Sequence, residues 1–120
     1  MRPQSPSWTK YLQCNEESPE RAAIFFANHR AAIIDIWMIE GTKHSVSLPV
    51  KDIVQKSRHL RACQIMVIHT HPSGNPNPSP QDVTMTRLLA ARLRQQRQRL
   101  TDHIILTHNR YFSFRSNRML

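Results

Sequence analysis

Apolar and polar residues recur with two different periods along the chain, which predicts both strands and helices. Short apolar runs bounded by turn residues predict strands at residues 22–27, 31–39, 65–68, 102–107 and 111–115. Apolar residues at helical spacing predict helices at residues 50–63 and 82–100. The resulting order, β-β-α-β-α-β-β, favours a single α/β domain with a mixed β-sheet flanked by helices.

The first 19 residues lack either period. Their prolines are Pro3, Pro6 and Pro19. We therefore expect residues 1–19 to form an N-terminal arm that is partly disordered, with one short turn around residues 8–12. The domain itself is predicted to span residues 20–120. Val46 and Leu48 alternate with serines, and they are candidates for a further short strand.

Residues 65–82 carry the most specific chemistry in the sequence. An apolar run ends in His69-Thr70-His71, and a loop rich in proline and asparagine leads from there to Asp82. Side chains two residues apart on a strand share a face, so His69 and His71 can present both imidazoles to one point. The loop can fold back and add the Asp82 carboxylate. Two neutral imidazoles and one carboxylate are typical of a catalytic zinc site with its fourth position open, so we predict these three residues as Zn²⁺ ligands.

A structural interpretation of the same segment competes with this one. Ser79-Pro80-Gln81-Asp82 is a favourable helix start, with serine at the N-cap, proline at the first helical position and an acid at the third. Ser79 and Asp82 could then be a helix cap and nothing more. A His-x-His pair alone is weak evidence for a metal, but the longer string around it is more specific.

That longer string is His69-x-His71-Pro72-Ser73-Gly74 followed by Pro78-Ser79-x-x-Asp82. It resembles the zinc motif of the JAMM (MPN+, JAB) family, and within that family the RadC-type branch. Further segments that agree with the family order are Gly41-Thr42, Asp102-His103-Ile104-Ile105 and Tyr111-Phe112-Ser113-Phe114. The resemblance covers roughly residues 18–120 and implies a JAMM/MPN-like domain with cytidine-deaminase-like layering. It also implies a zinc metallopeptidase, in which metal-activated water attacks a peptide or isopeptide carbonyl.

The resemblance further implies a glutamate that acts as general base and lies just before the first strand. Matching Ile33-Ile34 and the first strand to the family pattern places Glu20 there, although Ala22 stands where the family has an aromatic residue. Glu40, at the end of the second predicted strand, is the alternative base. Either residue could instead be an ordinary solvated glutamate.

Two more residues gain candidate roles from the resemblance and from their neighbours. Ser79 occupies the family position whose hydroxyl stabilises a tetrahedral oxyanion, a role that competes with N-capping. His103, beside Asp102, is a candidate to orient a metal ligand. The chain also departs from the RadC-type pattern, with Thr70 in place of asparagine and Val50-Lys51-Asp52 in place of Pro-Arg-Glu. Neither departure touches a predicted ligand, but both leave substrate handling open.

Composition adds expectations about partners and compartment. The 120 residues include 17 Lys+Arg and 8 Asp+Glu, a net charge of +9, which favours a polyanionic partner such as DNA. The alternative is a basic surface that only keeps the protein soluble. The two cysteines, Cys14 and Cys63, support no disulfide framework, and Cys63 is predicted to be buried. No membrane-length apolar run or signal peptide is visible, so we expect a cytoplasmic protein without a membrane partner.

Two functions follow as hypotheses. The first is the zinc hydrolase, acting on a peptide or protein substrate. The alternative is a nucleic-acid-binding accessory protein in DNA repair or recombination, with a structural or vestigial zinc site; the basic charge and the association of the RadC-type name with DNA repair favour it. A deaminase zinc site would require His-x-Glu and Pro-Cys-x-x-Cys, and neither is present. Substrate and oligomeric state stay open.

Overall fold

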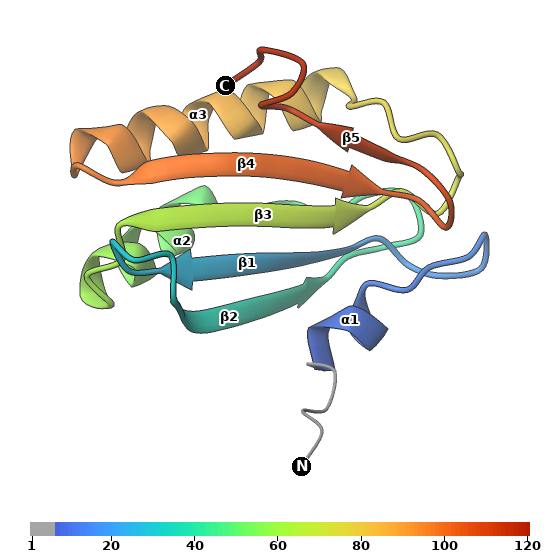
Figure 1. The fold of residues 1–120 in the computed structure, drawn as a ribbon. Coiled ribbons are helices and arrows are strands. Elements are labelled where there is room, and N and C mark those ends of the chain that lie inside the picture. The colour runs from blue at the N-terminus through green and yellow to red at the C-terminus, as the bar shows by residue number, and fades with distance from the viewer. Residues whose placement is uncertain (1–6) are drawn as a thin grey trace.

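A five-stranded mixed sheet forms the central layer of the structure (Figure 1). The computed structural model describes residues 7–120. The strands are β1 (Arg21–Ala27), β2 (Ile33–Glu40), β3 (Gln64–Thr70), β4 (Arg99–Leu106) and β5 (Tyr111–Ser113). The helices are α1 (Ser7–Tyr11), α2 (Val50–His59) and α3 (Pro80–Gln95). Within the described residues, none of these helices is long and apolar enough to cross a membrane.

The strands lie in the order β2-β1-β3-β4-β5. Only the central pair, β3 and β4, is parallel, and the other neighbours are antiparallel. The α/β class, the mixed sheet and the two predicted hairpins, β1–β2 and β4–β5, are therefore confirmed. The parallel pair requires a crossover connection, and α3 supplies it.

Both faces of the sheet are covered. α2 and α3 lie on one side (Figure 1) and close the larger core, whose members include Ala22, Ile24, Phe26, Ile53, Ile65, Val67, Leu89 and Leu93. On the other side Trp8 of α1 meets Phe25 edge to face, with ring centroids 5.1 Å apart. The short turn expected at residues 8–12 is thus the helix α1. Burial on both faces explains why the central residues of β1 read as one continuous apolar run.

The two main helices end earlier than predicted. α3 covers only part of residues 82–100, because Arg97 adopts a left-handed conformation with a φ of 61° and turns the chain. Just beyond, the buried Gln98 amide donates to the carbonyl oxygens of Ser57 (2.9 Å) and Ala62 (2.6 Å), which anchors this turn to the end of α2. No glycine or proline marks either helix end in the sequence, so the apolar spacing alone overextended both helices.

Two smaller predictions are wrong. Val46 and Leu48 are buried in the larger core, but their segment enters no strand pairing. Cys63 is exposed rather than buried, because it lies in the turn between α2 and β3 instead of on a packed face.

Strand register brings the polar side chains of the motif segments to one end of the sheet. His69, near the end of β3, pairs with Ala22 of β1 on one side and Ile105 of β4 on the other. Glu20 immediately precedes β1, and because β1 is antiparallel to β3 it reaches the same end. The first turn of α3, with Asp82, begins there after the loop that follows β3 (Figure 1).

Gly41 lets the chain leaving β2 fold tightly back beside Glu20. A Cβ at position 41 would lie 2.2 Å from the Ser45 carbonyl oxygen and 2.7 Å from the Cα of Val46. The same turn holds the Glu20 backbone: Glu20 N–H donates to the Thr42 carbonyl (2.7 Å) and Gly41 N–H donates to the Glu20 carbonyl (2.8 Å). The Gly-Thr pair is therefore a structural support for the start of β1.

We expect Gly41→Ala to lower the free energy of unfolding by about 1–3 kcal/mol, because the added methyl group has no room. Ser47→Ala is a suitable control, since Ser47 is exposed in the same segment, and its effect should stay within about 0.5 kcal/mol. Urea unfolding monitored by tryptophan fluorescence measures both. Equal stability of Gly41→Ala and the wild type would contradict the close approach at this turn.

Candidate metal centre

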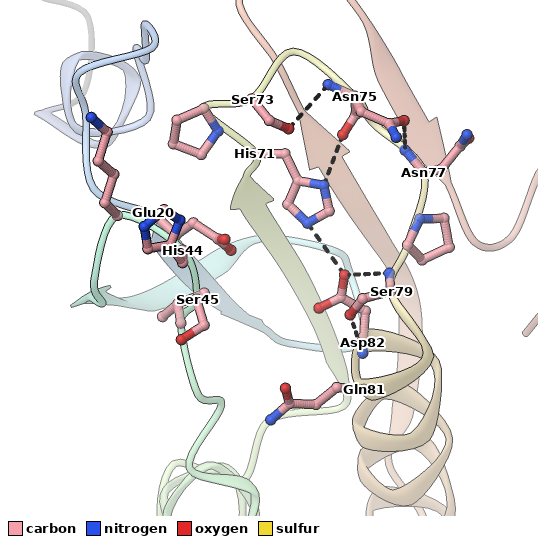
Figure 2. A pocket seen from close by; sticks show the side chains of 14 residues that line it. Glu20, His44, Ser45, His71, Ser73, Asn75, Asn77, Ser79, Gln81 and Asp82 are labelled. Atoms are coloured by element: carbon pink, nitrogen blue, oxygen red, sulfur yellow. Dashed lines mark hydrogen bonds and ion pairs between the residues drawn. The ribbon is translucent and has the colours of Figure 1, made fainter.

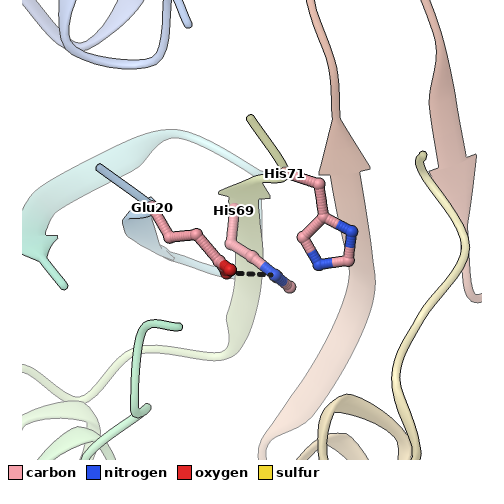
Figure 3. Close-up of side chains that lie close together, drawn as sticks. All are labelled: Glu20, His69 and His71. Carbon is pink, nitrogen blue, oxygen red and sulfur yellow. Dashed lines mark ion pairs between the residues drawn. The ribbon is translucent and has the colours of Figure 1, made fainter. Parts of the chain in front are cut away.

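Two imidazoles and two carboxylates converge at the end of β3. His69 Nε2 lies 3.7 Å from Glu20 Oε1 and 3.7 Å from Asp82 Oδ1. His71 Nε2 lies 3.2 Å from Asp82 Oδ2. The ligand atoms of Glu20, His69 and His71 are all within 4.8 Å of one another, so this group could hold a metal ion (Figure 3). The structure thus places the three predicted ligands and the first candidate base in a single cluster.

The cluster opens onto a cavity of about 470 Å³, within the usual range for ligand sites. Its walls come from the segment that follows β2 and from the loop between β3 and α3 (Figure 2). Glu20, His71 and Asp82 line the cavity, whereas His69 is only 2% exposed and lies behind them. One side of the cluster is therefore accessible to a ligand and the other is sealed by the core.

A chain of hydrogen bonds behind His69 determines which of its ring nitrogens carries the proton. The Thr86 hydroxyl lies 2.6 Å from the carbonyl oxygen of Asp82, which can only accept, so the hydroxyl donates to it. The hydroxyl oxygen must then accept the proton of His103 Nδ1, 2.6 Å away. His103 Nε2 in turn accepts from His69 Nδ1 at 2.7 Å. His69 therefore carries its proton on Nδ1 and directs the Nε2 lone pair at the cluster.

This chain requires neutral rings, and burial provides them. Desolvation lowers the pKa of His69 to about 4 and the pKa of His103 to about 3. His103 also stacks on Phe114 with ring centroids 4.7 Å apart. At neutral pH, His69 Nε2 is consequently an unprotonated, buried nitrogen that has no hydrogen-bond partner among residues 7–120. Such an atom is costly unless a ligand satisfies it.

His71 is also held through its Nδ1, but by a different partner. Its Nδ1 lies 2.9 Å from the Asn75 carbonyl oxygen, which can only accept, so Nδ1 is protonated and Nε2 faces Asp82. Burial lowers the pKa of His71, but the hydrogen bonds with Asp82 and Asn75 outweigh it and raise the pKa above its usual value. For Asp82, burial raises the pKa, but the contacts with His71 and His69 outweigh burial and hold the pKa well below its usual range. A proton held by this pair would be released when a metal binds.

The donor set fits zinc. Zinc takes histidine nitrogens and carboxylate oxygens at about 2.0–2.1 Å, which places neighbouring atoms of a tetrahedral shell about 3.3 Å apart. The 3.2 Å between His71 Nε2 and Asp82 Oδ2 and the 3.7 Å between His69 Nε2 and Glu20 Oε1 are close to that spacing. Asp82 meets His69 through its other oxygen, Oδ1, also at 3.7 Å. Glu20 is as close to His69 as Asp82 is, so the distances admit either carboxylate as the third ligand.

The hydrogen-bond chain predicts an effect at a residue that touches no metal. Thr86→Val removes the acceptor of the His103 Nδ1 proton and frees the rings to change tautomer. We expect zinc affinity, measured by competition with a chromophoric chelator, to fall by about 10–100-fold. Thr84→Val is the matched control: Thr84 makes the same bond to a carbonyl four residues earlier, at 3.1 Å, but on the exposed side of α3. A change of equal size in both variants would refute a specific role for Thr86.

The alternative base, Glu40, has a different environment from Glu20. Its Oε1 accepts a hydrogen bond from Arg21 Nε at 3.1 Å, and its side chain is 56% exposed. Glu20, at 13% exposure, faces His69 instead. The structure therefore gives Glu40 a surface ion pair and brings Glu20 to the histidines.

Ser79 and Asp82 form the helix cap that the sequence also allowed. The Ser79 hydroxyl accepts from Asp82 N–H at 3.0 Å, and Asp82 Oδ2 accepts from Ser79 N–H at 2.9 Å (Figure 2). The cap coexists with the approach of the same carboxylate to His71, so the two interpretations of this segment do not exclude each other. Because the Ser79 oxygen accepts in the cap, its own proton can still be donated into the cavity that it lines.

The remaining motif residues support the site from outside. Asp102 accepts from the Ser113 hydroxyl (2.6 Å) and from Arg115 N–H (3.0 Å), and so joins β4 to β5 near His103. Thr70, the departure from the family's asparagine, accepts from Arg21 N–H at 2.9 Å. This bond fixes the residue next to Glu20.

Sequence reasoning did not identify Thr86 or the carbonyl of Asn75. A signal for Thr86 did exist, since a threonine between Met85 and Leu89 stands on the apolar stripe of its helix, where a buried hydroxyl needs a partner. The Asn75 contact is made by the main chain, and no side-chain pattern reports it.

Comparison with known proteins places this geometry in a family context. The model of the "RadC-like JAB domain" family matches residues 4–119. UPF0758 protein PM1152 of Pasteurella multocida is 31% identical over 113 residues, which cover 92% of this chain and 50% of that protein. UPF0758 protein YkfG of Escherichia coli is 26% identical over 113 residues, which cover 94% of this chain and 72% of that protein. A UPF0758 protein of Aquifex aeolicus is 39% identical over 80 residues, or 67% and 35% of the two chains. The chain spans about half the length of several curated relatives that it matches.

Proposed function

The chain belongs to the family of RadC-like JAB domains, and from this premise and the geometry of the metal centre we propose that it is a zinc-dependent hydrolase of peptide or isopeptide bonds. The observation that carries the proposal is the buried, unprotonated His69 Nε2, which faces two carboxylates at the wall of a cavity. JAB domains include metalloproteases. Zinc bound here would polarise a substrate carbonyl and bring the pKa of a water molecule toward about 7.

We assign zinc binding to His69, His71 and Asp82. Each of the three is held by other groups: the imidazoles by the Nδ1 hydrogen bonds described above, and the carboxylate by the cap at the start of α3. Rigid placement is what a metal ligand requires, because the ion selects a fixed geometry. Glu20 stands just before β1, and its carboxylate lies 3.7 Å from His69 Nε2 but belongs to no helix cap, which leaves it available to take up and release a proton.

Glu20 is then the general base. Burial raises the pKa of Glu20, the charge of His71 lowers it and the charge of Asp82 raises it, with a net increase. A carboxylate with a raised pKa suits proton transfer near neutral pH. It would take one proton from the attacking water and deliver it to the departing amine nitrogen, so that the C–N bond breaks as a new carboxyl group forms.

Ser79 supplies a hydrogen-bond donor on the cavity side of the cluster. Its hydroxyl proton can stabilise the negative oxygen that develops on the attacked carbonyl carbon. A preformed donor of this kind acts in the transition state, and here the cap fixes its position.

We also propose a cytoplasmic location, since Cys14 and Cys63 are both free thiols, which suits a reducing compartment.

Hydrolysis in ¹⁸O-labelled water tests the proposal. The zinc-loaded chain is incubated with a peptide library and with isopeptide-linked peptides, and the products are analysed by mass spectrometry. We expect new carboxyl groups that carry a single ¹⁸O atom, loss of cleavage with a chelator, and recovery when zinc is restored. Stoichiometric zinc without cleavage of either class would contradict the hydrolase and favour a structural zinc site.

A further inference from the structure

A second cavity, of about 630 Å³, lies along α3 and shares no lining residue with the metal centre. Four arginines and no acidic side chain contribute to its lining. The arginines are Arg87, Arg94, Arg99 and Arg115, and we call this site the arginine cavity. None of the four has a carboxylate within 4.0 Å among residues 7–120. They therefore form no ion pair with the described part of the chain.

The part of the cavity that α3 lines combines charged side chains with small apolar ones. Arg87 and Arg94 are two helical turns apart, about 10.5 Å along the axis, and so they project from the same side of α3. Ala90 and Ala91 lie between them and also line the cavity. Small side chains at this point allow a ligand to approach the helix between the two guanidinium groups. Other apolar lining residues are Leu100, Met119 and Leu120.

One of the four arginines, Arg115, is held in a fixed position by main-chain carbonyl groups. Arg115 Nε donates to the Thr101 carbonyl oxygen, and its Nη2 donates to the Leu100 carbonyl oxygen at 3.3 Å. Arg115 N–H also donates to Asp102 Oδ1 at 3.0 Å, so both backbone and side chain are anchored to β4. A guanidinium held in this way has less conformational entropy to lose when it binds an anion.

We propose that the arginine cavity binds single-stranded nucleic acid, with its guanidinium groups on the phosphates and its apolar surface against sugars and bases. The planar guanidinium matches a phosphate with paired hydrogen bonds, and it can also stack on a base. A single strand presents phosphates together with exposed base faces, and this cavity combines arginines with alanine, leucine and methionine side chains. A duplex stacks its bases inside, and an acidic peptide has no comparable faces. This proposal is independent of the hydrolase, because the two cavities have no residue in common.

Two double variants of equal charge test the proposal. Arg87→Gln with Arg94→Gln removes two charges from the arginine cavity, whereas Arg30→Gln with Lys51→Gln removes two from exposed positions outside it. Binding is followed by the fluorescence anisotropy of a labelled DNA single strand of about 20 nucleotides. We expect the cavity variant to lose at least about fivefold in affinity, and the slope of log K against log salt to shrink by about 1.4. The control variant should change the affinity by less than about twofold and keep its salt slope.

Four results would overturn the proposal. Equal losses in both double variants would mean that binding follows net charge alone. Failure of the wild type to bind the labelled single strand would contradict the proposal outright. Equally tight binding of a duplex of the same sequence, or equal competition by polyglutamate of matched charge, would reject the single-strand assignment. Circular dichroism serves as the check on folding, because helix content should be unchanged in both double variants whatever the fate of the hydrolase proposal.

Discussion

Glu20→Gln is expected to lower the rate of peptide or isopeptide hydrolysis by about 10²–10⁴-fold while zinc stays bound. The amide keeps the shape of the carboxylate but cannot accept the proton of the attacking water. Glu20 faces His69 Nε2 at 3.7 Å, and burial raises its pKa, so its replacement removes the acid best placed to move that proton. Activity is measured on the substrate that the ¹⁸O experiment identifies, and zinc content by elemental analysis of the same sample.

Glu40→Gln is the matched control for this variant. Glu40 carries the same group, but it pairs with Arg21 in an exposed ion pair, and such pairs contribute little to stability. We expect activity within about twofold of the wild type. A large loss in Glu40→Gln with full activity in Glu20→Gln would reverse the assignment of the base. Loss of zinc from Glu20→Gln would instead make Glu20 a ligand.

Asp82→Asn is expected to reduce zinc affinity by more than about 100-fold, because a direct ligand matters more than the groups that orient one. The substitution separates the two roles of this residue. Asparagine can still accept from Ser79 N–H through its amide oxygen, so the cap at the start of α3 is preserved. Its amide lacks the negative charge that a zinc ligand supplies and that holds His71 in place. Chelator competition measures the affinity, and circular dichroism confirms that helix content is retained.

Asp52→Asn provides a control at an equivalent helical position. Asp52 is the third residue of α2, as Asp82 is of α3, but it is exposed and lies outside the metal centre. Its replacement should leave zinc affinity within about twofold. Wild-type zinc affinity in Asp82→Asn would reduce Asp82 to a helix cap.

The sequence predicted the local parts of the site well, because they depend on short spacings. The two-residue period of a strand places His69 and His71 at one end of β3, and the Ser79 cap fixes the first turn of α3 beside them. The buried strands were recognisable for a similar reason, since both faces of β1 are covered and its residues are apolar throughout. Each of these features is determined within about ten residues of sequence.

Features that depend on distant pairing were harder to predict. Glu20 reaches His69 only because β1 lies next to β3 with Ala22 opposite His69. The contact between His69 and His103 requires β4 to pair parallel with β3, and the Thr86 contact requires α3 to cross over that pair. Helices α2 and α3 end at His59 and Gln95, and each is followed within two residues by a left-handed residue, Arg61 or Arg97. The hydrogen bonds of Gln98 then join the two helix ends. Tertiary contacts rather than local propensity decided these features.

Thr70 shows how a departure from the family pattern can be accommodated. The family's asparagine is replaced by a residue whose hydroxyl accepts from Arg21 N–H at 2.9 Å, just after Glu20. Together with the Gly41 turn, this bond fixes the backbone on both sides of the proposed base. Support of this kind holds a catalytic group in place through its neighbours rather than through its own side chain.

The most direct test is a crystal structure of the zinc-loaded chain, with anomalous diffraction recorded on both sides of the zinc absorption edge. We predict one strong zinc peak at the end of β3, bonded to His69 Nε2, His71 Nε2 and an oxygen of Asp82, with the Glu20 carboxylate nearby but not bonded to it. A peak bonded to Glu20 in place of Asp82, or no peak between the two histidines, would contradict the account.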